Sequence, residues 1–273
     1  MENYNKYILI SDLDGTLINS NNQISEKNHE AVKHFIQHGG IFAVATGRTI
    51  QNIRPHIKDL AINGPCVLYN GSAVYDFSTE SLINIEYLEN LEIVKYIEYC
   101  INNFRSMDVK IFTPEMMYIV TPEENIDPSV FSEKQIFQLT TIEQIINMQW
   151  IKVMFYDTHT NLLKAEKAME AFGLCDKINR VFSHEYYLEF LKKDVSKGTA
   201  LKYIKQMEEY RNRAVIAVGD FDNDLEMIKS ADYGIAVDNA RECVKQVADK
   251  VIVSNDQDAI YHIIHNIIPE IDR

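Results

Sequence analysis

The sequence predicts an α/β fold with a parallel sheet that is interrupted by an inserted α/β domain. Strand-like apolar runs alternate with helix-like segments at both ends of the chain, which is the pattern of βαβ units. The stretch between these ends has strands and helices of its own but no polar motif at a strand end. Because 273 residues exceed a typical single domain, we expect a core of residues 1–82 and 189–273 and an insertion of residues 83–188.

The N-terminal part of the core begins with a strand, a helix and a second strand. Apolar runs predict strands over residues 7–10, 41–45 and 66–69. Ser25 is a suitable N-cap for a helix whose apolar positions recur at helical spacing, and Gly39 is a suitable stop. A strand, helix and parallel strand in succession form a right-handed crossover.

The remaining elements follow from the same patterns. In the C-terminal part of the core we expect helices over 197–210, 223–230, 240–248 and from Asp258, and strands over 214–218, 234–237 and 250–253. In the insertion we expect strands over 109–112, 117–120, 151–156 and 180–182, and helices near 88–104 and 159–172, with Trp150 in its core.

Polar residues follow several of the predicted core strands at the point where each strand ends. Asp12 and Asp14 follow the first strand, residues 46–48 the second, residues 70–71 the third, and residues 219–224 a later one. In an open α/β sheet, ligands bind outside the carboxyl ends of the strands. The sequence therefore predicts that these residues share one rim of the sheet.

Four short motifs carry a resemblance to a known family. The runs Asp-Leu-Asp-Gly-Thr at 12–16, Ala-Thr-Gly-Arg at 45–48, Val-Ser-Lys-Gly at 195–198 and Gly-Asp-Phe-Asp-Asn-Asp at 219–224 resemble the ordered motifs of the haloacid dehalogenase superfamily of phosphohydrolases. Their spacing, the long insertion and the tail at 234–240 resemble the Cof-type branch, which has a large α/β cap of the C2B type. The resemblance implies a Rossmann-like core and a cap that selects the substrate.

The resemblance assigns catalytic roles to three residues. Asp12 is the expected nucleophile, which takes the phosphoryl group as an aspartyl-phosphate. Asp14 is the expected acid for the leaving alcohol and the base for the incoming water. Lys197 is the expected point charge that offsets the phosphate and orients Asp12.

A divalent cation is also expected, because a carboxylate that approaches a phosphate dianion is repelled. Two unit charges 4 Å apart interact by roughly 4 kcal/mol at an effective dielectric of 20. Mg²⁺ prefers hard oxygen ligands. The resemblance implies the side chains of Asp12 and Asp220 and the backbone carbonyl of Asp14 as ligands, with Asp224 as a group behind them or a further ligand.

Five residues are expected to hold the phosphate or substrate: Leu13, Thr46, Gly47, Lys197 and Asn223. Some alternatives stay open. Thr46 also suits the N-cap of the helix that follows it. Arg48 and Asn70 are expected close to the rim, but a salt bridge for Arg48 and an ordinary turn for Asn70–Gly71 explain these residues equally well, so neither receives a catalytic role.

Composition limits the partners. The chain has 40 acidic and 27 basic residues and a net charge of −13, which argues against nucleic acid and against an anionic membrane surface. No apolar stretch approaches the roughly 20 residues that a membrane helix needs. We expect a cytoplasmic protein that binds a small phosphorylated metabolite, while its oligomeric state stays open.

The leading hypothesis is a Mg²⁺-dependent phosphatase of small metabolites, with sugar phosphates first and phosphorylated cofactors such as pyridoxal phosphate or flavin mononucleotide next. The alternatives are a sugar phosphomutase and a phospho-accepting signalling module. Asp14 and a domain-sized insertion would be superfluous to such a module, whose acyl-phosphate must persist.

Overall fold

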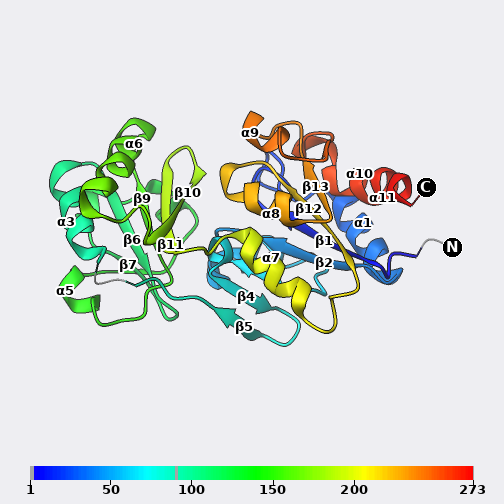
Figure 1. Cartoon of the computed structure of the whole chain (residues 1–273), viewed down its shortest axis with the longest axis horizontal. Coiled ribbons are helices and arrows are strands. Elements are labelled where there is room, and N and C mark those ends of the chain that lie inside the picture. Colours follow the sequence, from blue (N-terminus) through cyan, green and yellow to red (C-terminus); the bar gives the residue numbers. More distant parts are fainter. Residues whose placement is uncertain (1–2, 90–91, 273) are drawn as a thin grey trace. The chain divides into compact units, whose positions relative to one another are not determined.

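The computed structural model describes residues 3–89 and 92–272, and the chain forms two compact units (Figure 1). One unit, the core, consists of the residues through Asn84 together with those from Ser196 onward. The other unit, the insertion, spans Ile85–Val195. It extends past residue 188 because the strand over Tyr187–Lys192 pairs with two other strands of the insertion.

The core contains an eight-stranded sheet in the order β14-β13-β12-β1-β2-β3-β4-β5. Its strands are β1 (Tyr7–Asp12), β2 (Ile41–Ala45), β3 (Cys66–Leu68), β4 (Ala73–Asp76), β5 (Ser81–Ile85), β12 (Ala214–Gly219), β13 (Tyr233–Ala236) and β14 (Lys250–Val251). The strands from β14 to β3 are parallel, and β4 is antiparallel to β3. The predicted α/β fold with a parallel sheet is confirmed.

The helices of the core are α1 (Glu26–Gln37), α2 (Ile50–Ile57), α7 (Lys197–Gln206), α8 (Leu225–Ser230), α9 (Glu242–Lys245), α10 (Ala259–His262) and α11 (Ile268–Ile271). Ser25 caps α1 as predicted, because its side chain accepts the N–H of Asn28. In the part of the chain that the structure describes, no helix has the length and apolarity that a membrane crossing requires.

Two core helices are shorter than predicted. The helix α7 ends at Gln206 instead of residue 210, because Met207 is extended and the following residues form turns. The helix α9 covers only Glu242–Lys245 of the expected 240–248. The N–H of Arg241, directly before it, donates to the carbonyl of Asp220 at 2.9 Å, so the chain there braces the loop after β12 instead of forming a helix.

The insertion contains a six-stranded sheet in the order β10-β11-β9-β6-β7-β8, antiparallel except between β7 and β8. Its elements are α3 (Val94–Asn103), β6 (Asp108–Phe112), β7 (Met117–Ile119), α4 (Pro128–Ser132), β8 (Phe137–Leu139), α5 (Ile142–Ile145), β9 (Lys152–Tyr156), α6 (His159–Ala168), β10 (Ile178–His184) and β11 (Tyr187–Lys192). The sequence patterns missed β8 and β11. The predicted helix over 88–104 begins only at Val94. Leu88, which was expected in this helix, instead donates its N–H to the carbonyl of Trp150. Residues 90–91 of the expected helix lie outside the described residues.

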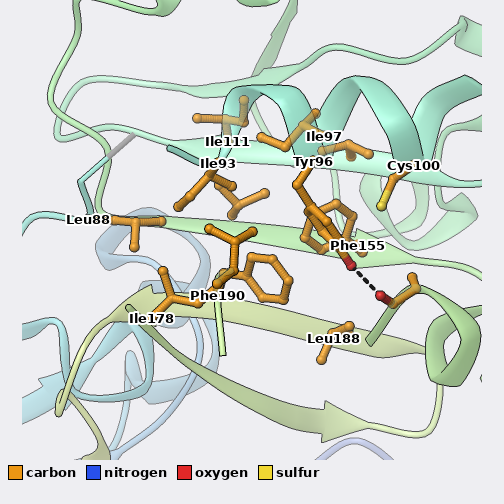
Figure 2. Close-up of a cluster of buried hydrophobic side chains, with 14 of the residues drawn as sticks. Leu88, Ile93, Tyr96, Ile97, Cys100, Ile111, Phe155, Ile178, Leu188 and Phe190 are labelled. Carbon is orange, nitrogen blue, oxygen red and sulfur yellow. Dashed lines mark hydrogen bonds between the residues drawn. The ribbon is translucent and has the colours of Figure 1, made fainter. Parts of the chain in front are cut away.

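An aromatic cluster forms the core of the insertion (Figure 2). The Tyr96 ring lies 5.8 Å from the Phe155 ring and 5.3 Å from the Phe190 ring, measured between centroids. The Tyr96 hydroxyl donates to the carbonyl of Ala165 at 2.7 Å, the dashed line in Figure 2. Trp150 is fully buried, as predicted, and its indole N–H donates to the carbonyl of Ile145. The insertion therefore has a hydrophobic core of its own.

Tyr96→Phe should lower the free energy of unfolding of the insertion by about 0.5–1.5 kcal/mol, because it removes one buried hydrogen bond and leaves the packing unchanged. Trp150 is the single tryptophan of the chain, so urea unfolding followed by its fluorescence reports on this unit. Tyr203→Phe, at a 38% exposed tyrosine of the core, is the matched control. Equal unfolding midpoints for both variants would contradict the expected contribution of the hydroxyl.

Candidate active site

The sheet register brings the polar motifs of the core to one rim. In the parallel pairing of β1 with its neighbours, Ser11 lies opposite Val218 of β12 and Asp12 lies opposite Ala45 of β2. Thr46 and Asp220 are therefore the first residues beyond the ends of two strands that flank β1. The convergence follows from parallel pairing alone, since all three strands end on the same side.

The loop after β1 is shaped around Asp220. Gly15 has a φ of +81°, and a Cβ at this position would lie 2.5 Å from the Oδ2 atom of Asp220, so a side chain there would both strain the backbone and strike the carboxylate. The Thr16 hydroxyl donates to Oδ1 of Asp220 at 3.0 Å. Sequence reasoning missed Thr16, although it stands in the first motif. Asn239 donates to the carbonyl of Gly15 at 2.7 Å and braces the same loop.

A buried ammonium joins two of the carboxylates. Lys197 is 0% exposed, and its Nζ atom donates to Oδ1 of Asp12 and to Oδ1 of Asp224, each at 2.6 Å. The lysine stands at the start of α7, where the side chain of Ser196 caps the helix by accepting the N–H of Thr199. An ammonium is buried at this depth only when it is paired, and here it is paired twice.

The electrostatics of the site follow from burial and from the excess of carboxylates. Burial, and next the charge of Asp224, raise the pKa of Asp12 well above its usual range, although Lys197 opposes the shift. The same two causes raise the pKa of Asp220 to about 7. Burial alone would lower the pKa of Lys197, but Asp12 and Asp224 raise it above its ordinary value. Lys197 is thus held as a cation, whereas burial and the neighbouring carboxylate disfavour the ionised forms of Asp12 and Asp220.

Asp224 is held by three donors. Besides Lys197 on one oxygen, its Oδ2 atom accepts the N–H of Asp220 at 2.9 Å and that of Phe221 at 3.2 Å. A Cβ on Gly219 would lie 2.4 Å from the Asp224 carboxyl carbon, so only glycine leaves room for this arrangement. The contacts favour a role for Asp224 in fixing Lys197 and the loop after β12 over a role as a metal ligand.

The acidic group fits a divalent cation. One carboxylate oxygen each of Asp12, Asp220 and Asp224 lies within 4.8 Å of the others. Asp14 adds a fourth carboxylate at the same rim, and within residues 3–89 and 92–272 the cations paired with these four groups are Lys197 and Arg48. An ionised site would therefore keep two uncompensated negative charges. Mg²⁺ prefers hard oxygen ligands. The carboxylates of this site supply such ligands together with an excess of negative charge.

The loop after β2 contains two threonines and decides the role of Thr46, which the sequence left open. The N-cap of α2 is Thr49, whose side chain accepts the N–H of Asn52 at 3.0 Å. Thr46 is therefore not the helix cap; it is 1% exposed, and its hydroxyl accepts the N–H of Arg48 at 3.2 Å. Arg48 forms the salt bridge that was one of its open interpretations, with both oxygens of Asp14, at 2.9 and 2.8 Å.

The other expected phosphate-binding residues lie in the same region. Leu13 has a fully buried side chain, so only its main chain can contribute. Asn223 donates from Nδ2 to Oδ1 of Asn70 at 2.9 Å. Asn70 itself is 1% exposed. It lies within the site instead of in a surface turn, which the Asn-Gly pair alone did not indicate.

Without metal, the free energy of unfolding should fall as the pH rises from about 4 to about 7. The unfolded chain ionises Asp220 near the ordinary pKa of 3.8, whereas the folded protein keeps the proton up to about 7. Within this window the folded state binds more protons, so raising the pH favours unfolding. Urea unfolding in EDTA at about pH 5 and about pH 8 measures the effect. Asp220→Asn cannot titrate and should lose this part of the pH dependence; an identical pH dependence would contradict the assignment.

Comparison with known proteins identifies the family of the chain. The chain matches the haloacid dehalogenase-like hydrolase family over residues 9–264. It is 24% identical over 256 residues to 5-amino-6-(5-phospho-D-ribitylamino)uracil phosphatase of Bacillus subtilis, covering 93% of this chain and 92% of the relative. It is 27% identical over 265 residues to a chloroplast endoribonuclease of Arabidopsis thaliana, covering 92% of this chain but 45% of that longer protein.

A solved structure shows the same fold over both units. It is a haloacid dehalogenase-like hydrolase from Bacteroides thetaiotaomicron, which superimposes with a TM-score of 0.79 at 27% identity and covers 97% of this chain and 100% of that one. The family match extends across the insertion and across all four motifs. The chain belongs to the haloacid dehalogenase-like hydrolase family, as an enzyme of its phosphatase type.

Proposed function

We propose that this phosphatase hydrolyses phosphate monoesters of small metabolites through an aspartyl-phosphate on Asp12, with Mg²⁺ as its cofactor. The observation that carries the proposal is the Lys197 ammonium, which is buried against Asp12 at the carboxyl end of β1. A carboxylate that is buried, held by a cation and placed at a strand end is suited to attack a bound phosphoryl group.

The proposed metal ligands are the side chains of Asp12 and Asp220 and the backbone carbonyl of Asp14. Mg²⁺ bound there would offset the repulsion between the Asp12 carboxylate and the phosphate dianion, roughly 4 kcal/mol for two unit charges 4 Å apart at an effective dielectric of 20. Thr16, through its hydrogen bond to Asp220, fixes one of these ligands. A hydrogen bond behind a ligand orients it toward the metal.

The reaction has two displacements. In the first, an oxygen of Asp12 attacks phosphorus, the bond from phosphorus to the ester oxygen breaks, and Asp14 gives its proton to that leaving oxygen. In the second, Asp14 takes a proton from water, the water oxygen attacks phosphorus, and the bond to Asp12 breaks to release phosphate. Lys197 stays protonated throughout and stabilises the charge on Asp12 and on the phosphoryl oxygens.

Arg48 acts on the position of Asp14. Both oxygens of Asp14 accept from the guanidinium, while the Asp14 side chain is 47% exposed. The bidentate pair holds the carboxylate in one orientation. Proton delivery to a leaving group requires that one Asp14 oxygen exchange its contact with Arg48 for a contact with the substrate. Arg48 is therefore a positioning residue in this scheme.

The proposed substrates are sugar phosphates first and phosphorylated cofactors such as pyridoxal phosphate or flavin mononucleotide next. In support, the Bacillus subtilis relative is named for a phosphate ester of a ribityl chain attached to a ring. All the proposed catalytic residues belong to the core, so the insertion is the part that remains to select the leaving group, as a cap would. The acidic chain, with a net charge of −13, makes nucleic acid an unsuitable partner.

Asp12→Asn should reduce phosphate release to the uncatalysed background, because it removes the nucleophile and keeps the shape of the side chain. Asp14→Asn should lower kcat by about 10²- to 10⁴-fold, the contribution of a general acid and base. The measurement is phosphate release from a panel of sugar phosphates and phosphorylated cofactors with Mg²⁺ and with EDTA.

Asp59→Asn, at an exposed aspartate of the core, is the matched control and should behave as the native protein. Full turnover by Asp12→Asn, or equal turnover in EDTA, would refute the mechanism. The products are identified as well as quantified. An isomerised ester without free phosphate would indicate a phosphomutase. A long-lived phosphorylated protein would indicate a signalling module.

A further inference from the structure

The turn between β3 and β4 holds an unsatisfied buried donor. Among the described residues, the buried side-chain nitrogen and oxygen atoms without a hydrogen-bond partner are Nδ2 of Asn70 and Oγ of Ser72. Both stand in this one turn, and both residues are at most 1% exposed. A buried donor left unpaired is destabilising, so such an atom in a native protein calls for a specific explanation.

The backbone of the turn is strained as well. Tyr69, Asn70 and Gly71 follow one another with φ of 51°, 55° and 107°. Left-handed conformation is costly for residues other than glycine, least so for asparagine. The turn is held by two hydrogen bonds to the loop after β2, from the N–H of Tyr69 to the Arg48 carbonyl at 3.2 Å and from the N–H of Asn70 to the Thr46 carbonyl at 3.0 Å.

This backbone places the Asn70 side chain among the site loops. Its Oδ1 atom accepts from Asn223 at 2.9 Å, and a Cβ built on Gly47 would lie 2.9 Å from its Nδ2 atom. The adjacent Gly71 packs on the start of α7, since a Cβ there would lie 2.1 Å from the Ser196 carbonyl oxygen. The unpaired amide nitrogen therefore lies beside two residues expected to hold phosphate, Gly47 and Asn223.

We propose that Asn70 binds the phosphoryl group, donating from Nδ2 to one of its oxygens in the substrate and in the Asp12-bound intermediate. A phosphoryl oxygen is an anionic acceptor and supplies the partner that Nδ2 lacks. An amide suits this position because one atom accepts from Asn223 while the other donates to the ligand. The assignment deepens the proposed function and rests on it for the identity of the ligand.

The test measures the binding of inorganic phosphate to the full chain with Mg²⁺, by calorimetry and as product inhibition. Asn70→Asp keeps the size, the left-handed conformation and the acceptor for Asn223, but loses the donor. Asn70→Gly also permits the backbone and adds no charge. Both should weaken phosphate binding by about 10-fold or more, the scale of a hydrogen bond to a charged group. The loss should be the same for every ester in a panel, because the phosphoryl group is their common part.

The control is Asn22→Asp, at an exposed asparagine that also has a left-handed φ, 58°; it should leave phosphate binding unchanged. Mg²⁺ affinity without phosphate separates contact from structure, since Asn70 touches none of the carboxylates in any described contact. Unchanged phosphate affinity in Asn70→Gly overturns the proposal, and so does an equal loss of Mg²⁺ affinity, which would indicate a structural role. If the native protein binds phosphate yet hydrolyses no ester, the proposed function fails while the binding data still decide the role of Asn70.

Discussion

The buried ion pairs of Lys197 with Asp12 and Asp224 are the interaction on which the site depends. The pair with Asp12 joins residues 185 positions apart, across the whole length of the insertion, and the pair with Asp224 joins residues 27 positions apart. Removing the ammonium would leave two buried carboxylates facing each other, a change of the kind that costs about 3–5 kcal/mol. The lysine therefore fixes the start of α7 against β1 and β12, and it also places a positive charge in the site.

Local charge explains how a strongly acidic chain binds an anion. The oxygens of Asp224 accept from Lys197 and from two backbone N–H groups, so its negative charge stabilises the loop after β12. Burial, and next the charge of Asp224, raise the pKa values of Asp12 and Asp220, so their ionised forms call for a compensating cation. A divalent cation bound beside these carboxylates would supply the compensating positive charge. Within a few ångströms its charge would outweigh the distant acidic residues, whose effect salt screens over about 8–10 Å.

The sequence predicted what depends on local pattern and parallel pairing, namely the fold class, most core strands and the meeting of the strand-end motifs at one rim. Local pattern did not predict contacts between residues distant in the chain, and the contact of Lys197 with Asp12 was expected only from the family resemblance. The hydrogen bond from Thr16 to Asp220 spans 204 positions, and the salt bridge from Arg48 to Asp14 spans 34. The choice of Thr49 over Thr46 as helix cap depended on where α2 begins. In the insertion, β11 was missed because the predicted boundary after residue 188 falls inside Tyr187–Lys192.

The two units differ in how their residues are stabilised. The insertion is stabilised by its own aromatic core around Tyr96 and Phe155, whereas the core unit carries a strained turn at Asn70, an unpaired donor and an excess of buried carboxylates. Strain of this kind persists only where surrounding structure over-determines it, and here the parallel strands and the N-terminus of α7 provide that frame. No motif residue lies within the insertion's sheet, so substitutions there leave the buried carboxylates and donors of the core in place.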